Sequence, residues 1–403
     1  MATNKNDNKK KSREYALDKF DVDVSSNSTK KVSKIPKQKN PIKRFAAAVF
    51  PQASDTAGDK ARKVVLLAAV AILIGTVAFL IYQLNGIKVS GDKSDNIASL
   101  AGVPNYPGSG SGSGASSRNS YSALDRIENP DPTIATTAGN EEPEFIDLTP
   151  VVNTPLNVDF DSLISQNPDT RAWIQISGTL LNTAVLQSTY DFDYYIDHDF
   201  YGNYDEFTGS VFSSDKNKWD GTDDNIIMYG HKLNNGYGFG YVVHYVPNDG
   251  SREPLAFYKV HPTILFQQPG GPSETYKIFA GILTNTEEQY GEVFEYMNKT
   301  KFTDAADFNN YMIEIMDRSW FYTDVDLKYG DKLLTLSTCY WPLGKSIPTR
   351  WVLFARKVRP GESEEVDTSV AQRNWGAKLF EYYYQVVGGQ WYGSNWDTSK
   401  LLS

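Results

Sequence analysis

Cysteine is the scarcest residue type in this sequence of 403 residues, which contains one, Cys339. A single thiol excludes an internal disulfide framework and the cysteine-rich ligand sets of structural zinc sites. Histidine is scarce as well, with four residues, and the spacing of His198, His244 and His261 to carboxylates fits no strong zinc or calcium signature. We therefore expect these three histidines to be structural, and we expect neither a metal site nor a cofactor.

An overall excess of positive charge is also absent, since the chain carries a net charge of −9, and we expect no nucleic-acid partner. The charge is unevenly distributed along the chain. Residues 1–63 contain 16 Lys and Arg against 7 Asp and Glu, and few apolar residues. We predict that this basic segment is a disordered tail in the cytosol, lying against anionic lipid headgroups.

Long uncharged apolar runs are absent apart from one, at residues 64–82. At about 1.5 Å per residue this run can cross roughly 30 Å of hydrocarbon, and we predict a transmembrane helix over 64–84. Lys60, Arg62 and Lys63 directly precede it, which places the amino terminus in the cytosol and the C-terminal bulk outside the cell. A cleaved signal peptide is the alternative, but the preceding charged region is too long and no A-x-A-like site follows.

The remaining chain divides by composition into three segments. Residues 85–156 are rich in Gly, Ser, Pro, Asp and Asn and include a Gly/Ser repeat at 108–114, which indicates a flexible extracellular linker. Residues 157–360 have the length of one domain. Residues 361–403 form a C-terminal extension that we expect to be helical in part, over 379–387.

Short strands dominate the pattern of the 157–360 domain. Eight segments are β-branched or aromatic and are bounded by turn residues, at 173–176, 184–187, 209–212, 226–229, 263–266, 276–280, 332–338 and 351–358. Helical spacing occurs over 158–165, where we expect Asp161 to cap the helix, and over 303–320, after a Thr303/Asp304 start signal. The pattern predicts a mostly β domain, either a closed barrel or a sandwich.

Three residues with acyl-transfer chemistry lie at the ends of predicted strands. Cys339 ends the 332–338 strand, His231 follows the 226–229 strand, and Arg350 opens the 351–358 strand. A thiolate is a strong nucleophile that cationic neighbours favour, and an imidazole can transfer protons. A guanidinium cannot act as a base at neutral pH, so Arg350 is limited to stabilising developing negative charge. The exported location strengthens this interpretation, because an unpaired thiol is a liability in an oxidising compartment unless its reactivity is used.

The combination of these motifs resembles the class B sortases, the membrane-anchored cysteine transpeptidases of Gram-positive bacteria. The resemblance covers about Asp159 to Val358. It rests on Asn-Pro-Asp at 167–169 before Ala-Trp-Ile at 172–174, Tyr-Tyr-Ile-Asp-His-Asp-Phe-Tyr-Gly at 194–202, Tyr-Gly-His at 229–231, a helix at 303–320, and Leu-Thr-Leu-Ser-Thr-Cys at 334–339 followed by Arg350.

This resemblance implies an eight-stranded sortase β-barrel with an N-terminal helical addition and a helix before the cysteine strand. By analogy, Cys339 attacks the Thr carbonyl of a sorting signal, His231 transfers protons, and Arg350 stabilises the oxyanion. The resemblance also implies that five residues line the substrate groove: Ile196, Tyr296, Met297, Ser337 and Thr338. The expected partners are surface proteins with an Asn-Pro-x-Thr-x signal and an acceptor amine of peptidoglycan or of a pilin.

The sequence departs from the family pattern at Asp191-Phe192-Asp193, where many members carry an Asn. Two other functions remain open. One is a different wall thiol transpeptidase of the L,D-transpeptidase kind, although the usual Ser-His-Gly-Cys arrangement is missing. The other is a non-catalytic anchored wall-binding protein, against which the retention of Cys339, His231 and Arg350 argues.

Overall fold

The computed structural model describes residue 45 and residues 48–104, 147–205, 207–248 and 252–402. Most of the basic tail and the 108–114 repeat lie outside the described residues. The chain forms two compact units, residues 1–77 and 78–403. Within the described ranges, one helix is long and apolar enough to cross a membrane, with a candidate span of Ala57–Tyr82. This finding is consistent with the predicted transmembrane helix.

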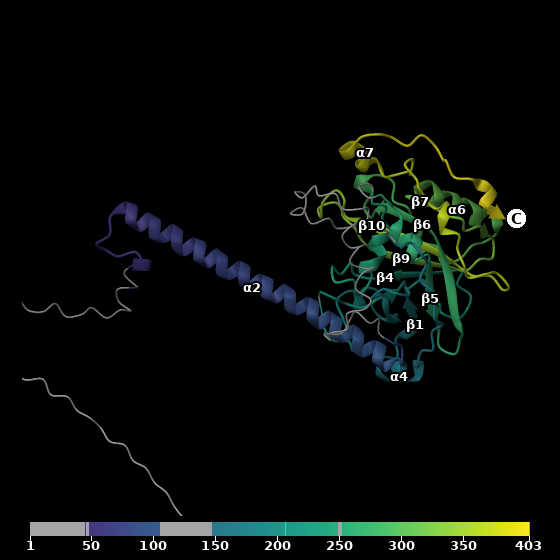
Figure 1. The fold of residues 1–403 in the computed structure, drawn as a ribbon, viewed down its shortest axis with the longest axis horizontal. Helices are drawn as coiled ribbons and strands as arrows, with labels where there is room; N and C mark the ends of the chain where they lie inside the picture. Colours follow the sequence, from purple (N-terminus) through teal and green to yellow (C-terminus); the bar gives the residue numbers. More distant parts are fainter. Residues whose placement is uncertain (1–44, 46–47, 105–146, 206, 249–251, 403) are drawn as a thin grey trace, which may run out of the picture. The chain divides into compact units, whose positions relative to one another are not determined.

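A closed barrel of eight strands forms the centre of the second unit, in the order β1-β2-β3-β4-β9-β10-β6-β5. The strands are β1 (Thr170–Gln175), β2 (Asn182–Leu186), β3 (Phe212–Ser213), β4 (Asn225–Tyr229), β5 (Thr263–Gln267), β6 (Ser273–Asn285), β9 (Leu333–Cys339) and β10 (Thr349–Lys357). Neighbouring strands are antiparallel except for the parallel pairs β2–β3 and β4–β9. The predicted mostly β fold is confirmed, and of the two predicted architectures, barrel and sandwich, the domain has the closed barrel (Figure 1).

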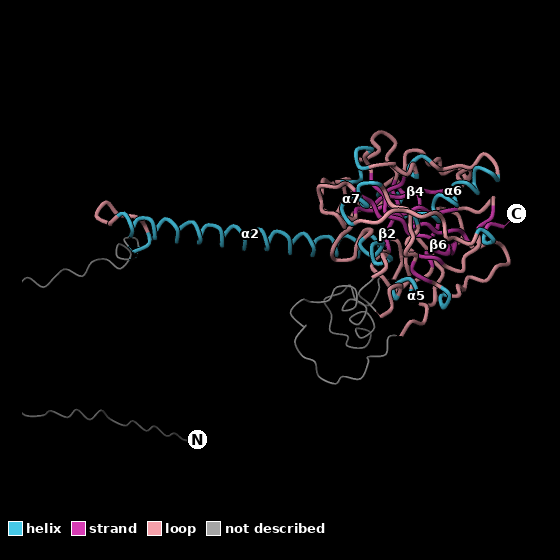
Figure 2. The backbone as a smooth tube through the Cα atoms, turned by 90° about the horizontal axis from the view of Figure 1, so that it is seen from above, coloured by secondary structure: helices cyan, strands magenta, loops and turns pink. Residues whose placement is uncertain are grey.

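Helices and short strands surround the barrel, as Figure 2 shows with the strands in the middle of the domain. The α-helices are α2 (Ala57–Leu100), α4 (Phe160–Gln166), α5 (Ala256–Val260), α6 (Ala305–Arg318) and α7 (Glu381–Val387). The 3₁₀ turns are η1 (Tyr194–Ile196), η2 (Gly240–Tyr245), η3 (Glu288–Tyr290), η4 (Tyr296–Asn298), η5 (Thr368–Val370) and η6 (Thr398–Lys400). Two-residue strands are β7 (Phe321–Tyr322), β8 (Leu327–Lys328), β11 (Gln372–Arg373) and β12 (Leu401–Leu402).

Helix caps follow local hydrogen-bonding chemistry. Asp304 caps α6, as the sequence predicts, by accepting a hydrogen bond from the backbone N–H of Asp307. The cap of α4 is Asp159 and not Asp161, because the Asp159 carboxylate accepts hydrogen bonds from both the backbone N–H and the hydroxyl of Ser162. The expectation for Asp161 is therefore wrong by half a turn.

Both faces of the central strands are buried. Along β10, Trp351 and Leu353 belong to one apolar cluster, while Val352 and Phe354 belong to a second cluster. This alternation follows from the two-residue period of a strand. The second cluster includes Phe308 of α6, so α6 covers one outer face of the barrel and supports the strands that carry the candidate site.

The first part of the predicted linker, from residue 85, is helical in the structure. Helix α2 continues to Leu100, and Ile97, Ala98 and Ala101 are buried in a cluster with Trp173 and other residues of the domain. The Nζ of Lys93 also lies 2.9 Å from the Asp199 carboxylate and 2.7 Å from that of Asp205. These tertiary contacts stabilise a helix whose Gly- and Ser-containing sequence has a weak helical preference of its own.

The described end of the same predicted linker is ordered against the domain as well. The backbone N–H of Val151 donates to the carbonyl of Val260 at 2.8 Å, and Leu156 is buried. Residues 105–146 of the predicted linker lie outside the described residues, so the prediction for that part is not tested.

Candidate active site

Cys339 and Arg350 form a cross-strand pair. Cys339 is the last residue of β9 and Arg350 the second residue of β10, and the two are directly opposite each other in the antiparallel ladder. Opposed residues of such a pair have Cβ atoms about 5 Å apart. The Cys339 side chain is half-buried. The barrel therefore brings a thiol and a guanidinium together at one strand end.

His231 reaches the same end of the barrel through β4. This strand runs parallel to β9, with Tyr229 opposite Ser337, so the chain two residues further on brings His231 to the level of Cys339. Two hydrogen bonds join the end of β9 to Gly230, the residue between β4 and His231. The Thr338 hydroxyl donates to the Gly230 carbonyl at 2.8 Å, and the Gly230 N–H donates to the Ser337 carbonyl at 3.3 Å.

The imidazole of His231 is oriented by a backbone carbonyl. Its Nε2 lies 2.5 Å from the carbonyl oxygen of Ile196, at the end of η1. The loop that follows closes on itself, since the Phe239 N–H donates to the His231 carbonyl at 2.9 Å. A Cβ at Gly230 would approach the Phe239 ring to 2.9 Å, so this close packing favours glycine.

Cys339 and His231 make no hydrogen bond with each other among the described residues. Arg350 Nη1 donates to the carbonyl of Thr349 at 3.2 Å. Catalytic hydrogen bonds are often long or absent before substrate binds and form in the reacting complex. The arrangement can thus hold a nucleophile, a proton carrier and an oxyanion donor around one reacting carbonyl.

The five residues expected to line a substrate groove fall into two groups. Ile196 is 43% exposed, and Met297 is half-buried beside Tyr296 on η4. Ser337 and Thr338 are buried, and each hydroxyl already has a partner within the protein. Their positions favour a supporting role behind the groove surface.

Tyr296 is buried close to the candidate catalytic residues. Its buried hydroxyl lies 2.8 Å from the Ser337 hydroxyl. Burial raises the pKa of Tyr296 to about 12, although the hydrogen bond with Ser337 and the positive charge of Arg350 act in the opposite direction. Tyr296 is therefore neutral at physiological pH and lies within electrostatic reach of both Arg350 and Cys339.

Two features at or beside the candidate site do not follow from the predicted motifs. The first is the main-chain role of Ile196 as the partner of His231, which a side-chain motif does not reveal. The second is a cavity of about 540 Å³ that lies between Tyr340, the residue after Cys339, and the loop after His231. The clustering of Gly236, Gly238 and Gly240 was a signal for such a tightly turned loop.

The other histidines lie in packed surroundings. The His198 ring stacks on Tyr194 with centroids 3.9 Å apart, and the buried His261 has its Nδ1 3.0 Å from the Ser177 carbonyl. Within the described ranges, no three His, Cys, Asp or Glu side chains are grouped so that they could hold a metal ion.

Comparisons with known proteins place the chain in a family. No protein-family model matches it. Sortase B of Listeria monocytogenes is 30% identical over 188 residues, which are 47% of this chain and 70% of that protein. Sortase B of Staphylococcus aureus is 29% identical over 180 residues, which are 45% and 67% of the two chains.

Solved structures of sortase B are also similar. The S. aureus structure is 28% identical, with a TM-score of 0.42, and the match covers 50% of this chain and 86% of that one. The Clostridium perfringens structure is 29% identical, with a TM-score of 0.42, and the match covers 50% and 100%. Since the Listeria relative reaches 30% identity over most of its length and this chain has a closed eight-stranded barrel, the chain belongs to the class B sortases, a family of cysteine transpeptidases.

Proposed function

We propose that this sortase cleaves an Asn-Pro-x-Thr-x sorting signal at the C-terminus of surface proteins and transfers the new Thr carboxyl end to an amine of peptidoglycan or of a pilin. The observation that carries the proposal is the cross-strand pairing of Cys339 with Arg350, with His231 at the same level on the parallel neighbour of β9. This arrangement supplies the groups that acyl transfer requires.

In the first step, the Cys339 thiolate attacks the Thr carbonyl carbon, and Arg350 donates hydrogen bonds to the oxyanion that forms. The C–N bond then breaks, protonated His231 gives its proton to the departing amine, and a thioester remains on Cys339. In the second step, neutral His231 accepts a proton from the incoming amine as it attacks the thioester. The collapse of that intermediate releases the Cys339 thiolate and leaves an amide.

In this proposal the exposed Ile196 on η1 and the half-buried Met297 on η4 border the groove that selects the signal, and the buried Tyr296 supports it from behind. Class B membership supports the Asn-Pro-x-Thr-x preference. The solved structures of relatives include a complex of S. aureus sortase B with a substrate.

The site of action follows from the candidate span Ala57–Tyr82 and the cluster of Lys60, Arg62 and Lys63 near its start. We infer a single-pass membrane protein with a cytosolic amino terminus and an extracellular catalytic domain. This topology puts the domain on the side of the membrane where surface proteins and wall amines meet.

The test is a transfer assay with the full-length protein in detergent micelles. Peptides with Asn-Pro-x-Thr-x and Leu-Pro-x-Thr-Gly signals are each incubated with either triglycine or a blocked lysine amide, and mass spectrometry identifies the products. We expect cleavage after Thr and an amide with the added amine, with the Asn-Pro peptide preferred. Equal use of both peptides would contradict the signal, and normal turnover by Cys339→Ala would contradict the mechanism.

A further inference from the structure

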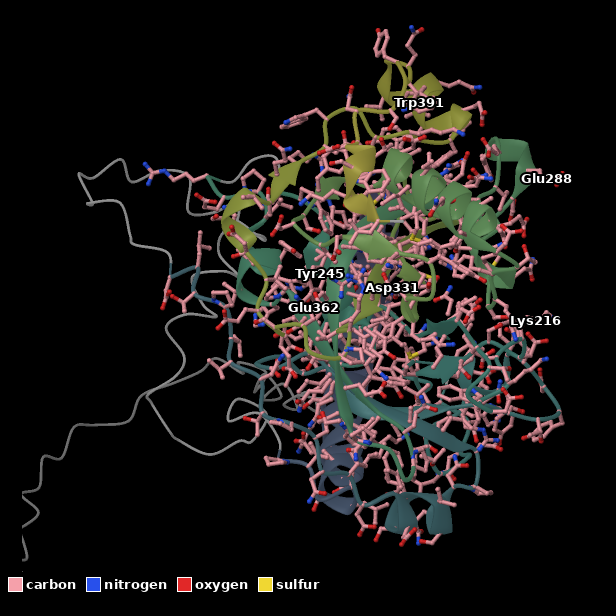
Figure 3. The ribbon with its side chains drawn as sticks, turned by 90° about the vertical axis from the view of Figure 1, so that its right-hand side faces the viewer. Lys216, Tyr245, Glu288, Asp331, Glu362 and Trp391 are labelled. Atoms are coloured by element: carbon pink, nitrogen blue, oxygen red, sulfur yellow. The ribbon has the colours of Figure 1, made fainter. Side chains whose placement is uncertain are left out.

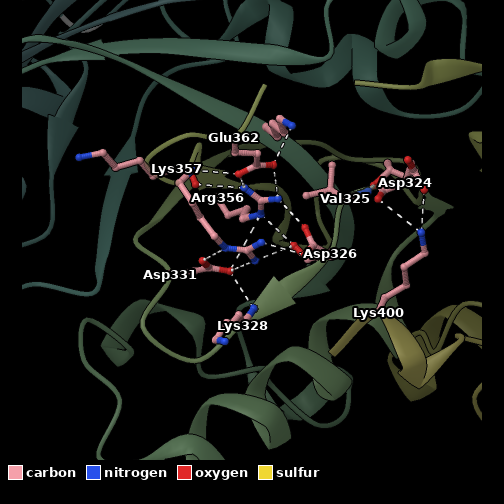
Figure 4. Close-up of polar contacts among 12 residues, drawn as sticks. Asp324, Val325, Asp326, Lys328, Asp331, Arg356, Lys357, Glu362 and Lys400 are labelled. Carbon is pink, nitrogen blue, oxygen red and sulfur yellow. Dashed lines mark hydrogen bonds and ion pairs between the residues drawn. The ribbon is translucent and has the colours of Figure 1, made fainter. Parts of the chain in front are cut away.

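The C-terminal extension, residues 361–403, is fixed to the barrel at its start. Arg356 of β10 is 1% exposed, and its Nη1 and Nη2 lie 2.6 and 2.7 Å from the Glu362 carboxylate. Lys277 of β6 donates to the same carboxylate at 2.8 Å, and Asp326 and Arg359 complete the network. Figure 4 shows the contacts of Arg356 with Glu362 and Asp326. Because these ions are paired and largely shielded from water, the extension leaves the barrel from a defined point.

The extension is held again on either side of α7. Before α7, β11 pairs with β7, and the Lys378 N–H donates to the Asp317 carbonyl at 2.7 Å. After α7, β12 pairs with β8, and Lys400 lies 2.7 Å from Asp324. Figure 3 shows Glu362 near the centre of this side of the domain and Trp391, beyond α7, at its edge.

The start of α7 lies directly against the turn formed by residues 286–292. The Glu381 carboxylate accepts a hydrogen bond from the Glu292 N–H at 2.8 Å, and the Tyr382 and Tyr290 rings meet edge to face at 5.2 Å. Gly291 has a φ of +119°, and a Cβ there would lie 1.7 Å from the Glu381 carboxylate. Only glycine fits both this conformation and this approach.

A salt bridge adds to the contact between the extension and the turn. The Nζ of Lys378 lies 3.0 Å from the Glu292 carboxylate, which Arg318 of α6 also contacts at 2.9 Å. We name residues 378–383 the C-terminal clamp.

The turn under the clamp is joined to the connection between Cys339 and Arg350. The Tyr290 hydroxyl donates to the Ser346 carbonyl at 3.4 Å, and the Thr286 N–H donates to the Pro348 carbonyl at 3.1 Å. Ser346 and Pro348 belong to residues 340–348, the loop between the thiol and the guanidinium. The clamp therefore acts on this loop through the turn.

The same turn continues into the proposed groove. A few residues after Glu292 the chain forms η4, with Tyr296 and Met297. At the other end of the turn, the Asn285 side chain donates to the Gly291 carbonyl at 2.9 Å, and the preceding residue, Thr284, is the cross-strand partner of Arg350 on β6.

We propose that the C-terminal clamp is a positioning element that fixes the two loops bordering the thiol, residues 286–298 and 340–348, in the conformation that binds the sorting signal. The proposal rests on the function proposed above and adds a positioning role for Glu381. These loops have few ladder hydrogen bonds of their own, so their fixed conformation depends on contacts such as those of the clamp. Loss of the clamp lowers the fraction of molecules with a competent groove and weakens signal binding by the same factor.

The test compares Glu381→Ala with Glu381→Gln in the full-length protein. Glu381→Ala removes the acceptor for the Glu292 N–H, and we expect the KM for the sorting-signal peptide to rise by about fivefold to tenfold, with kcat changed by less than about twofold. Glu381→Gln keeps an acceptor oxygen, so its KM should return most of the way to the wild-type value. Glu364→Ala, an exposed glutamate of the same extension, is the matched control and should keep the wild-type KM.

Amide hydrogen exchange supplies a measurement that does not depend on turnover. In Glu381→Ala we expect faster exchange in both 286–292 and 340–348, with β6 and β10 unchanged. A wild-type KM in Glu381→Ala, or a fall in kcat alone, would overturn the positioning role, as would exchange that changes in 286–292 and not in 340–348. Failure of the wild-type enzyme to cleave either sorting-signal peptide would instead contradict the proposed function. Even then, the exchange measurement would show whether the clamp fixes residues 286–292 and 340–348 together.

Discussion

At the scale of single residues, the site depends on where strands end. Cys339 is the last residue of its strand, so its side chain lies beside loops that can admit a peptide, while Ser337 and Thr338 are buried behind it. The cross-strand position of Arg350 directs a planar set of donors toward the same region. Residue identity at these positions can therefore be tested with little disturbance of the barrel.

Arg350→Lys keeps the positive charge but loses the forked geometry of the guanidinium. We expect kcat to fall by on the order of 10²–10³, as it does when an oxyanion donor is removed, with a smaller change in peptide binding. Steady-state kinetics checks this prediction, and the exposed Arg252→Lys is the control. A wild-type kcat in Arg350→Lys would show that the guanidinium takes no part in the reaction.

His261 should give the fold a defined pH dependence. Burial lowers the pKa of His261 to about 4, from an ordinary value of 6.5. Between about pH 4 and 6.5, the His261 imidazole is protonated in the unfolded chain and neutral in the folded chain. The contribution of His261 to stability is therefore complete above about pH 6.5 and declines as pH falls toward 4. We expect the free energy of unfolding to decline by about 1.4 kcal/mol per pH unit in that window.

Urea unfolding of the wild-type protein and of His261→Gln between pH 4 and 7 tests this dependence. The slope of stability against pH should be smaller in the variant, even if its stability is lower at every pH. An equal slope in both proteins would assign the pH dependence to other groups.

At the scale of elements, the barrel strands follow from short apolar runs, whereas four other features do not. The N-cap of α4 and the short helix α5 depend on local hydrogen bonds that a periodic pattern does not specify. The last turns of α2 contain Gly91, Asp92 and Ser94 and resemble a linker by composition, yet tertiary contacts of Lys93 and Ile97 keep them helical. Barrel closure between β1 and β5 is likewise a long-range pairing without a local signal.

The strand-end positions of Cys339, His231 and Arg350 were more predictable than these elements, because each residue adjoins a strand with a clear pattern. The support around them was not predictable. The Ile196 carbonyl beside His231 and the hydroxyl partners of Ser337 and Thr338 come from segments distant in sequence.

The start of the extension should contribute measurably to stability. Glu362→Gln removes the negative charge opposite the buried Arg356, while Asp326 still pairs with that guanidinium. We expect the free energy of unfolding to fall by about 1–3 kcal/mol, less than for a buried charge left wholly unpaired. Glu364→Gln should change it by less than about 0.5 kcal/mol. Equal stabilities in the two variants, by denaturant unfolding, would mean that the network does not stabilise the domain.

At the scale of the whole molecule, the distribution of charge and the apolar span together predict how the chain lies in the cell. The basic segment, residues 1–63, ends near the start of the candidate span Ala57–Tyr82, and the remaining 340 residues after position 63 carry a net charge of −18. An acidic domain outside the cell is consistent with retention of the basic segment on the cytosolic face.

Cys339 should then react with a membrane-impermeant thiol reagent on intact cells whose wall has been removed. As the only cysteine in the chain, it is the only target, and Cys339→Ala cells are the control. Labelling that occurs only after lysis would place the catalytic domain in the cytosol. A second labelling of intact cells after the catalytic domain has been unfolded excludes the case in which the fold shields the thiol.

The most direct test of the catalytic account is the capture of the thioester on Cys339. The full-length protein is mixed with an Asn-Pro-x-Thr-x peptide without an acceptor amine, quenched in acid and analysed by mass spectrometry. We predict an adduct equal in mass to the acyl part ending at Thr, located on Cys339, removed by hydroxylamine and absent from Cys339→Ala. Cleavage of the peptide at the normal rate by Cys339→Ala, or cleavage by the wild-type protein through an adduct on another residue, would contradict the account.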